Sequence, residues 1–254
     1  MPAPLSSLTF RAVIGHQLLV VADAHLNASA PADEEAFLAF LDRAPQLGDS
    51  LLLAGDIFDF WFTYKRLVPR ACMRVTARII ELARRFPILM IGGNHDRWGD
   101  TFWSASAGIT FDPRRVRCTV GDRLVVGLHG DGLHEEHWSA AALNRILGTP
   151  IVIRGFELLP PAAGFGIARL LGHYPDKTRA RAERIAAAAT RQAQFAGDLL
   201  RADADIGALV MGHTHRSALT EVEPGRWYVN PGAWLAEHRY AVITDSDIRL
   251  ETFA

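Results

Sequence analysis

Five short polar clusters carry the side chains of this sequence that could do chemistry, and each follows an apolar run. Their aspartate, histidine and asparagine side chains offer carboxylate oxygens, imidazole nitrogens and an amide oxygen, a mixed set of ligands that suits Mn, Fe, Zn or Mg. No cysteine lies among them, which argues against a structural zinc site. The clusters are Asp23-Ala24-His25, Gly55-Asp56 with Asp59, Gly93-Asn94-His95-Asp96, His129-Gly130-Asp131 and Gly212-His213-Thr214-His215.

The candidate ligands outnumber those that a single cation needs. One metal ion takes three or four protein ligands, whereas these clusters offer seven or more. Two metals that share a carboxylate account for the surplus, and such pairs lie roughly 3.5–4 Å apart. Taken singly, each cluster is weak evidence, because a lone histidine after a strand is more often a helix cap or a surface residue. Five clusters in the same setting favour one two-metal site.

The apolar runs predict the elements that must position these side chains. Buried strands are expected within QLLVVADAH, SLLLAGD, PILMIGGNHD, RLVVGLHGD and GALVMGHTH, each ending at a cluster. Helices are expected near 33–44 and from Pro69 to about Phe86. Binding sites of open α/β sheets lie at the carboxyl ends of the strands. The five clusters are therefore expected to converge on one place.

The order of the elements predicts an α/β fold in which two sheets pack face to face with helices outside. Four strands near the C-terminus, at 217–224, 226–232, 239–245 and 247–253, are expected to be antiparallel neighbours in one sheet. A helical insertion is predicted at about 134–201, within a single domain of residues 1–254. Its apolar part, 134–172, is broken by Arg154 and Pro160-Pro161, so it is neither a membrane span nor one amphipathic helix.

Composition excludes several classes of function. The chain has 254 residues, a net charge of −1 and no broad basic tract around the clusters, so a nucleic-acid partner is not expected. Two distant cysteines, Cys72 and Cys118, suggest ordinary thiols. The N-terminal residues lack the features of a signal peptide, and no stretch of eighteen apolar residues occurs. A cytoplasmic protein is expected, with peripheral contact to the inner membrane left open and the oligomeric state undetermined.

The motifs together resemble the calcineurin-like metallophosphoesterases. The signature of that superfamily is DxH, GDxxD, GNHD, a later His and GHxH, and all of it occurs between about residues 17 and 243. The resemblance implies a metallophosphoesterase-type sandwich of αββα layers with a helical lid, and two divalent ions, with Mn preferred over Mg, Fe or Zn. It implies that Asp23, His25, Asp56 and His215 bind one metal, and that Asp56, Asn94, His129 and His213 bind the other.

The same resemblance implies catalytic roles for His95 and Asp59. His95 corresponds to the histidine that protonates the leaving group or steadies the phosphate, and Asp59 would hydrogen-bond His95 and favour its charged form. Asn94 and His95 would also contact the substrate. Asp96 is expected to be a structural hydrogen-bonding residue rather than a catalytic one.

Longer stretches narrow the resemblance. GDIFDFWFTYKRLVPR, GNHDRWGDTFW and LHGDGL resemble the UDP-2,3-diacylglucosamine diphosphatase group of lipid A biosynthesis, in the branch with GNHD. The resemblance implies cleavage of a UDP-sugar pyrophosphate to UMP and a lipid phosphate. Alternatives are another metallophosphoesterase, acting as a broad phosphodiesterase or phosphatase, and a non-catalytic scaffold on the same fold. The ADAHLNAS segment departs from the usual Ser-Asp-Leu-His-Leu opening of the group but keeps Asp23 and His25.

Other residues are assigned to the substrate or to a membrane. Lys177 and Arg179 loosely match a basic step of the group and are expected to bind the pyrophosphate or uridine end. The apolar insertion could receive acyl chains or simply pack on the core. The aromatic residues after Asp56 are expected either to pack in the core or to lie beneath acyl chains, with Trp61 and Phe62 the better candidates to contact substrate and Phe58 and Phe60 assigned to the core. The stripe formed by Arg70, Arg74 and Arg78 either rests on an anionic membrane or is an ordinary helix surface.

Overall fold

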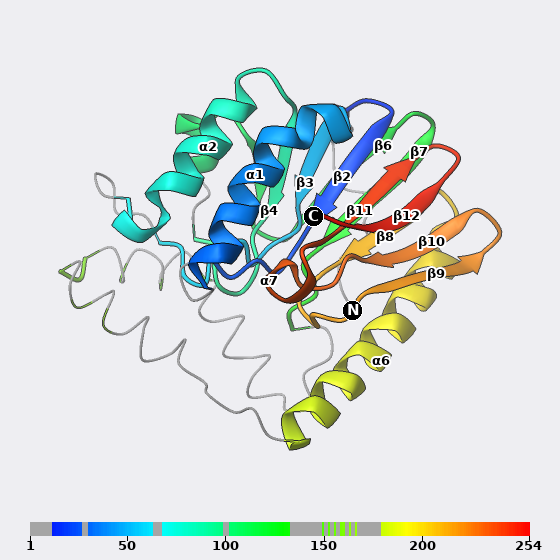
Figure 1. Ribbon diagram of the computed structural model, residues 1–254. Coiled ribbons are helices and arrows are strands. Elements are labelled where there is room, and N and C mark those ends of the chain that lie inside the picture. Colours follow the sequence, from blue (N-terminus) through cyan, green and yellow to red (C-terminus); the bar gives the residue numbers. More distant parts are fainter. Residues whose placement is uncertain are drawn as a thin grey trace.

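The structure is a computed structural model. It describes residues 12–26, 30–62, 68–98, 102–132 and 179–254, with a few single positions between 149 and 166. Two six-stranded sheets of described strands lie face to face, with helices on their outer sides (Figure 1). The predicted α/β fold of two sheets flanked by helices is therefore confirmed.

The first sheet has the order β12-β11-β2-β3-β4-β5. Strands β2 to β5 run parallel, whereas β11 is antiparallel to both β2 and β12. Three of the predicted strands, β2, β3 and β4, lie side by side in its centre. The bounds are β2 Gln17–Val21, β3 Ser50–Leu53, β4 Ile88–Ile91, β5 Thr110–Asp112, β11 Arg239–Thr244 and β12 Ile248–Thr252.

The second sheet has the order β1-β6-β7-β8-β10-β9. Strands β7 and β8, which precede the later histidine clusters, are parallel neighbours in its centre. β10 is parallel to β8 and antiparallel to β9. The bounds are β1 Ala12–Val13, β6 Arg115–Val120, β7 Arg123–Leu128, β8 Ala208–Met211, β9 Ala218–Glu223 and β10 Arg226–Asn230.

Alternating side chains of the central strands build three apolar layers. Leu19 and Val21 of β2 face the helices outside the first sheet, whereas Leu18 and Val20 face the second sheet. On β8 the same alternation sends Val210 between the sheets and its neighbours to the outer helix of the second sheet. Because both faces of each sheet are covered at its centre, the central strands are almost continuously apolar.

Helices cover the two outer faces. α1 and α2 lie over the first sheet, and the long helix α6 lies against β9 and β10 of the second (Figure 1). The first turn of α1 contains Pro31 and two acids, which suit a helix N-terminus. A 3₁₀ turn, Arg70–Cys72, leads into α2. The helices are α1 Pro31–Leu47, α2 Met73–Ala83, α6 Arg179–Ala202 and the short α7 Trp234–Glu237, with a π-helical turn at Phe102–Ser106.

The prediction for the four C-terminal strands is right about antiparallel neighbours but wrong in placing all four strands in one sheet. They form two antiparallel hairpins, and β9–β10 belongs to the second sheet whereas β11–β12 belongs to the first. Alternation of apolar and polar residues identifies a strand but does not say which sheet receives it, because both sheets offer an apolar face. Strands β1, β5 and β6 were not predicted.

The C-terminal part of the predicted insertion is helix α6, whose Ala196 and Leu200 pack against the second sheet. This helix is therefore an outer layer of the sandwich. The apolar part of the insertion and Lys177 lie almost entirely outside the described residues. Among the described residues, no helix has both the length and the apolar content that crossing a bilayer requires.

Two arginines of the predicted stripe, Arg74 and Arg78 of α2, face acids of α1. Arg74 Nη1 lies 3.0 Å from Glu34 Oε1 and 2.6 Å from Glu35 Oε1. Arg78 pairs with Asp42 and Glu81. Two of the three arginines are thus paired with neighbouring carboxylates, which reduces the positive charge that the stripe would present to an anionic membrane surface.

Candidate metal centre and active site

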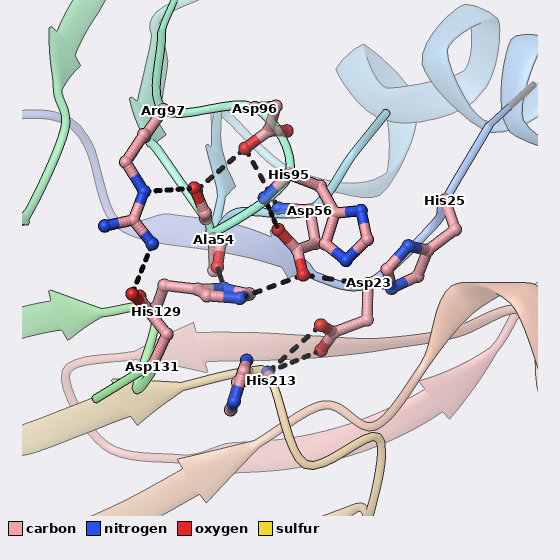
Figure 2. Close-up of polar contacts among 12 residues, drawn as sticks. Asp23, His25, Ala54, Asp56, His95, Asp96, Arg97, His129, Asp131 and His213 are labelled. Carbon is pink, nitrogen blue, oxygen red and sulfur yellow. Dashed lines mark hydrogen bonds and ion pairs between the residues drawn. The ribbon is translucent and has the colours of Figure 1, made fainter. Parts of the chain in front are cut away.

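The loops after β2, β3, β4, β7 and β8 bring the predicted ligands together (Figure 2). Asp23 N–H donates to the Gly55 carbonyl at 3.1 Å, which joins the first two loops, and Gly212 N–H donates to the His129 carbonyl at 3.0 Å, which joins the last two. His213 N–H donates to the Asp23 carboxylate at 2.9 Å. That last bond links the two sheets across the site.

One group of possible ligands contains Asp23, His25 and His215, whose donor atoms lie within 4.8 Å of one another. The Nε2 atoms of His25 and His215 are only 3.1 Å apart, and His215 Nε2 is 3.6 Å from Asp23 Oδ1. Asp23 is fully buried and His25 is nearly so. Two imidazole nitrogens that face each other beside a buried carboxylate are suited to share a cation.

A second group contains Asp56, His129 and His213, again within 4.8 Å. Asp56 Oδ2 lies 3.2 Å from His129 Nε2 and 3.9 Å from His25 Nε2, so this carboxylate stands between the two groups. His129 Nδ1 lies 2.9 Å from the Ala54 carbonyl. Because a carbonyl only accepts, Nδ1 carries the proton, and Nε2 is the atom available to a metal.

Asn94 contributes a buried acceptor with no donor. Its Oδ1 accepts no hydrogen bond from the described residues, which is unusual for a buried polar atom. The preceding Gly93 lies against Asp56, since a Cβ on Gly93 would stand 2.1 Å from Asp56 Oδ1. The glycine of the GNHD motif is therefore required because the Asp56 carboxylate occupies the space that a side chain would fill.

His95 and Asp59 are neighbours, but not through the contact that was predicted. His95 Nδ1 lies 2.5 Å from the main-chain carbonyl of Asp59. The Asp59 carboxylate lies between two histidines, 3.8 Å from His95 Nδ1 and 3.6 Å from His25 Nδ1. Since the carbonyl takes the Nδ1 proton, Nε2 of His95 is the nitrogen free to exchange a proton with another molecule.

Asp96 holds the loop that carries Asp56, in agreement with the structural role expected for it. Its buried carboxylate accepts from Ile57 N–H at 2.7 Å and Gly93 N–H at 2.7 Å, with a longer bond from Asp56 N–H at 3.2 Å. These bonds orient the main chain on both sides of the site. Arg97, the next residue, pairs with Asp131 (Figure 2).

Burial and neighbouring charges raise the pKa of some ligand groups and lower that of others. The four groups concerned are Asp23, Asp56, His129 and His215. Burial raises the pKa of Asp23 to about 7. Burial also opposes ionisation of Asp56, but the charges of His129 and His95 outweigh it and hold the pKa of Asp56 well below its usual range. The pKa of His129 is raised despite burial, because Asp56 lies beside it. Burial, followed by the charge of His25, lowers the pKa of His215 to about 4.

The backbone is strained at five of the proposed ligands. Positive φ values, between 43° and 69°, occur at Asp23, His25, Asp56, His213 and His215. Such left-handed conformations cost non-glycine residues of order 1–3 kcal/mol each and cluster at functional sites. The surrounding hydrogen bonds hold each side chain in a direction that ordinary strand or helix geometry does not allow.

Other predicted substrate contacts are placed differently. Trp61 is 0% and Phe62 1% exposed, so the prediction that these two contact substrate is wrong. Trp61 packs in an aromatic cluster with Phe58 and Trp103, within the apolar layer between the first sheet and its helices. Phe60, predicted to be core, is only half-buried. Arg179 begins α6, but its side chain, like all of Lys177, lies outside the described residues.

The donor set fits divalent cations. Carboxylate, imidazole and amide oxygen donors converge without a thiolate, and buried charges of this kind are costly unless they are paired or bind metal. Metal binding also explains why Asn94 Oδ1 has no hydrogen-bond donor among the described residues and why His25 Nε2 and His215 Nε2 face each other. A two-sheet sandwich with these ligands at its strand ends defines a metal-dependent hydrolase.

A family model described as Calcineurin-like phosphoesterase matches residues 16–217. This chain belongs to the calcineurin-like phosphoesterase family and is a metal-dependent phosphoester hydrolase. A Klebsiella pneumoniae subsp. pneumoniae protein named UDP-2,3-diacylglucosamine hydrolase is 27% identical, over 92% of this chain and 98% of the relative. A Sodalis glossinidius protein of the same name is 29% identical, over 93% and 98%. The solved phosphoesterase Yfce from E. coli has a TM-score of 0.43 at 13% identity, over 94% and 100%.

Proposed function

We propose that this enzyme cleaves the pyrophosphate of a UDP-2,3-diacylglucosamine-like nucleotide lipid to UMP and a lipid phosphate. The observation that carries the proposal is a match along 92% of the chain to relatives named for that substrate, in a chain whose ligand clusters lie together. The proposed location is the cytoplasm, with contact to the inner membrane surface where a lipid substrate would lie.

The proposed cofactor is a pair of divalent cations that share Asp56, with Mn preferred over Mg, Fe or Zn. The position of the Asp56 carboxylate between the two ligand groups supports the pair. When bound, the cations supply an activated water and charge that offsets the phosphoryl oxygens. Asp23, His25, Asp56 and His215 would hold one cation, and Asp56, Asn94, His129 and His213 the other.

The chain's own residues then handle the proton and the substrate. His95, which donates from Nδ1 to the Asp59 carbonyl, would hold its second proton at Nε2 and give it to the leaving phosphate oxygen. The Asp59 carboxylate lies 3.8 Å from His95 Nδ1 and would help to orient this imidazole. Asn94 and His95 would face the scissile phosphate. Lys177 and Arg179 would bind the pyrophosphate or uridine, and the apolar segment 134–172 the acyl chains.

Metal binding to the metal-free protein near pH 7 is expected to release protons. Asp23 has a pKa of about 7 and the pKa of His129 is raised, so both groups carry protons that a cation must displace. Below these pKa values the proton competes with the metal. Apparent Mn²⁺ affinity should therefore rise with pH, by up to about tenfold per pH unit for each proton displaced. Titration calorimetry in two buffers of different ionisation enthalpy measures the protons released. An affinity that does not change between about pH 6 and 8 contradicts this assignment.

The substrate proposal is tested by comparing the UDP-diacyl sugar with its deacylated analogue in Mn²⁺. We expect UMP release from both, with a large preference for the acylated form. Equal rates would remove the acyl-binding role of the insertion. Failure of the metal-loaded enzyme to release UMP, together with efficient hydrolysis of simple aryl phosphates, would replace the proposal with a broad phosphodiesterase or phosphatase.

A further inference from the structure

Helix α6 carries a buried glutamine toward the proposed metal centre. Gln192 is 0% exposed, whereas Ala193 and Gln194 beside it face solvent. The neighbouring buried positions of the helix, such as Ala196 and Leu200, are apolar and pack on the second sheet. A buried primary amide is costly unless its donors and acceptor are matched, so the partners of Gln192 are informative.

Both ends of the Gln192 amide bind the loop that carries His213 and His215. Nε2 donates to the Gly212 carbonyl at 3.0 Å, and Oε1 accepts from the Thr214 hydroxyl at 2.9 Å. Gly212 precedes His213, and Thr214 lies between the two histidines. The Gln192 side chain therefore binds the main chain just before His213 and also the residue between His213 and His215.

Two residues of β10 complete the network. The Tyr228 hydroxyl lies 3.3 Å from Gln192 Oε1. Asn230 Nδ2 donates to the Gly212 carbonyl at 3.2 Å and to Thr214 Oγ1 at 3.1 Å. All of these polar atoms are buried, so their hydrogen bonds are made in a low-dielectric setting where a lost partner is expensive.

Gln192 also contacts the loop after β7, which carries His129. A Cβ on Gly130, the residue after His129, would stand 2.3 Å from Gln192 Nε2. Gly130 also has φ of +112°, which other residues rarely adopt. The amide is thus wedged between the loops after β7 and β8, which supply His129, His213 and His215.

We propose that Gln192 is a positioning residue of the metal centre, which fixes the geometry of His213 and His215 and the spacing of their loop from His129. The proposal rests on the metal centre proposed above. Residues that orient metal ligands typically change metal affinity by about 10–100-fold when they are replaced. No motif marks Gln192 in the sequence, because it lies in an Ala- and Arg-rich helix far from the ligand clusters.

The test replaces Gln192 with methionine, which keeps the length of the side chain and removes its hydrogen bonds. Mn²⁺ affinity of metal-free Gln192→Met, measured by calorimetry well below its melting temperature, is expected to fall about 10–100-fold. Since Gln192 is fully buried and so not open to substrate, kcat at limiting Mn²⁺ should fall with KM little changed, and excess Mn²⁺ should restore kcat. A purely structural role would lower thermal stability without this metal-dependent rescue.

The matched control is Gln194→Met, at an exposed position two residues away, which is expected to bind Mn²⁺ like the unmodified protein. Thr214→Val, a milder change to the same network, should lower Mn²⁺ affinity in the same direction and decides the matter if Gln192→Met does not fold. Affinity within about twofold of the unmodified protein in the folded variant overturns the proposal. If the unmodified protein itself binds no divalent cation, the proposed metal centre fails as well, which separates the two failures.

Discussion

Asp56→Asn is expected to reduce hydrolysis by about 10³-fold or more while the protein remains folded. The Asp56 carboxylate lies within reach of both histidine groups, 3.2 Å from His129 Nε2 and 3.9 Å from His25 Nε2. An amide in its place keeps the shape but removes the negative charge that a shared ligand supplies. Loss of ~4 kcal/mol of charge stabilisation corresponds to about a thousandfold in rate. The measurements are kcat in excess Mn²⁺ and the number of Mn²⁺ ions bound.

Asp198→Asn is the matched control, because Asp198 is exposed on α6 and contacts only Arg201 among the pairs observed in the described chain. Its activity should equal that of the unmodified protein. If Asp56→Asn retains more than about a tenth of the activity, or binds the same number of Mn²⁺ ions with the same affinity, the shared-ligand assignment is wrong.

Arg123→Met is expected to lower the free energy of unfolding by about 2–4 kcal/mol without changing activity in the folded protein. The Arg123 guanidinium donates to four main-chain carbonyls, those of Thr244 at 2.8 Å, Asp245 at 2.7 Å, Gly207 at 3.2 Å and Gly225 at 3.1 Å. These carbonyls belong to turns of both sheets, at the opposite ends of the strands from the metal ligands. One side chain therefore ties the sandwich together there.

For a chain of this size, that loss corresponds to about 4–16 °C in melting temperature. Arg123→Lys should recover only part of it, because one ammonium group cannot span carbonyls that a planar guanidinium reaches together. Arg201→Met removes an arginine from exposed ion pairs and should change stability by less than about 1 kcal/mol. Equal melting temperatures for Arg123→Met and Arg201→Met would show that the four contacts contribute little.

The central part of the fold was predictable because each central strand has both faces buried. After a first polar residue in two of them, QLLVV, SLLL and ILMI are continuously apolar, and the metal-competent residues mark where each strand ends. β6, with the sequence RVRCTV, was missed because its arginines alternate with only short apolar side chains. The division of the last four strands between two sheets was not predictable either, since register and partner are set by long-range packing rather than by the local pattern.

In the site too, the ligand residues were predictable from local sequence, whereas contacts between distant segments were not. The residue types and their positions after strands indicate the cluster of Asp23, Asp56 and His213. What the sequence does not contain is how main-chain groups serve the site, such as the Ala54 carbonyl that fixes the His129 tautomer. The burial of Trp61 was not predictable either, because the local sequence does not say whether an aromatic side chain beside a site faces the substrate or the core.

The pairing of β2 with β11 places the two ends of the chain in one sheet, and this has a consequence for when activity arises. β2, which delivers Asp23 and His25, gains its second neighbour only when Arg239–Thr244 is available. The last two histidine ligands, His213 and His215, are also synthesised long after Asp23, with His213 190 residues further along the chain. Contacts of such sequence separation form late in folding. A nascent chain on the ribosome therefore carries an incomplete ligand set until residues 213–215 have been synthesised, and a chain that stops before them has no competent metal centre.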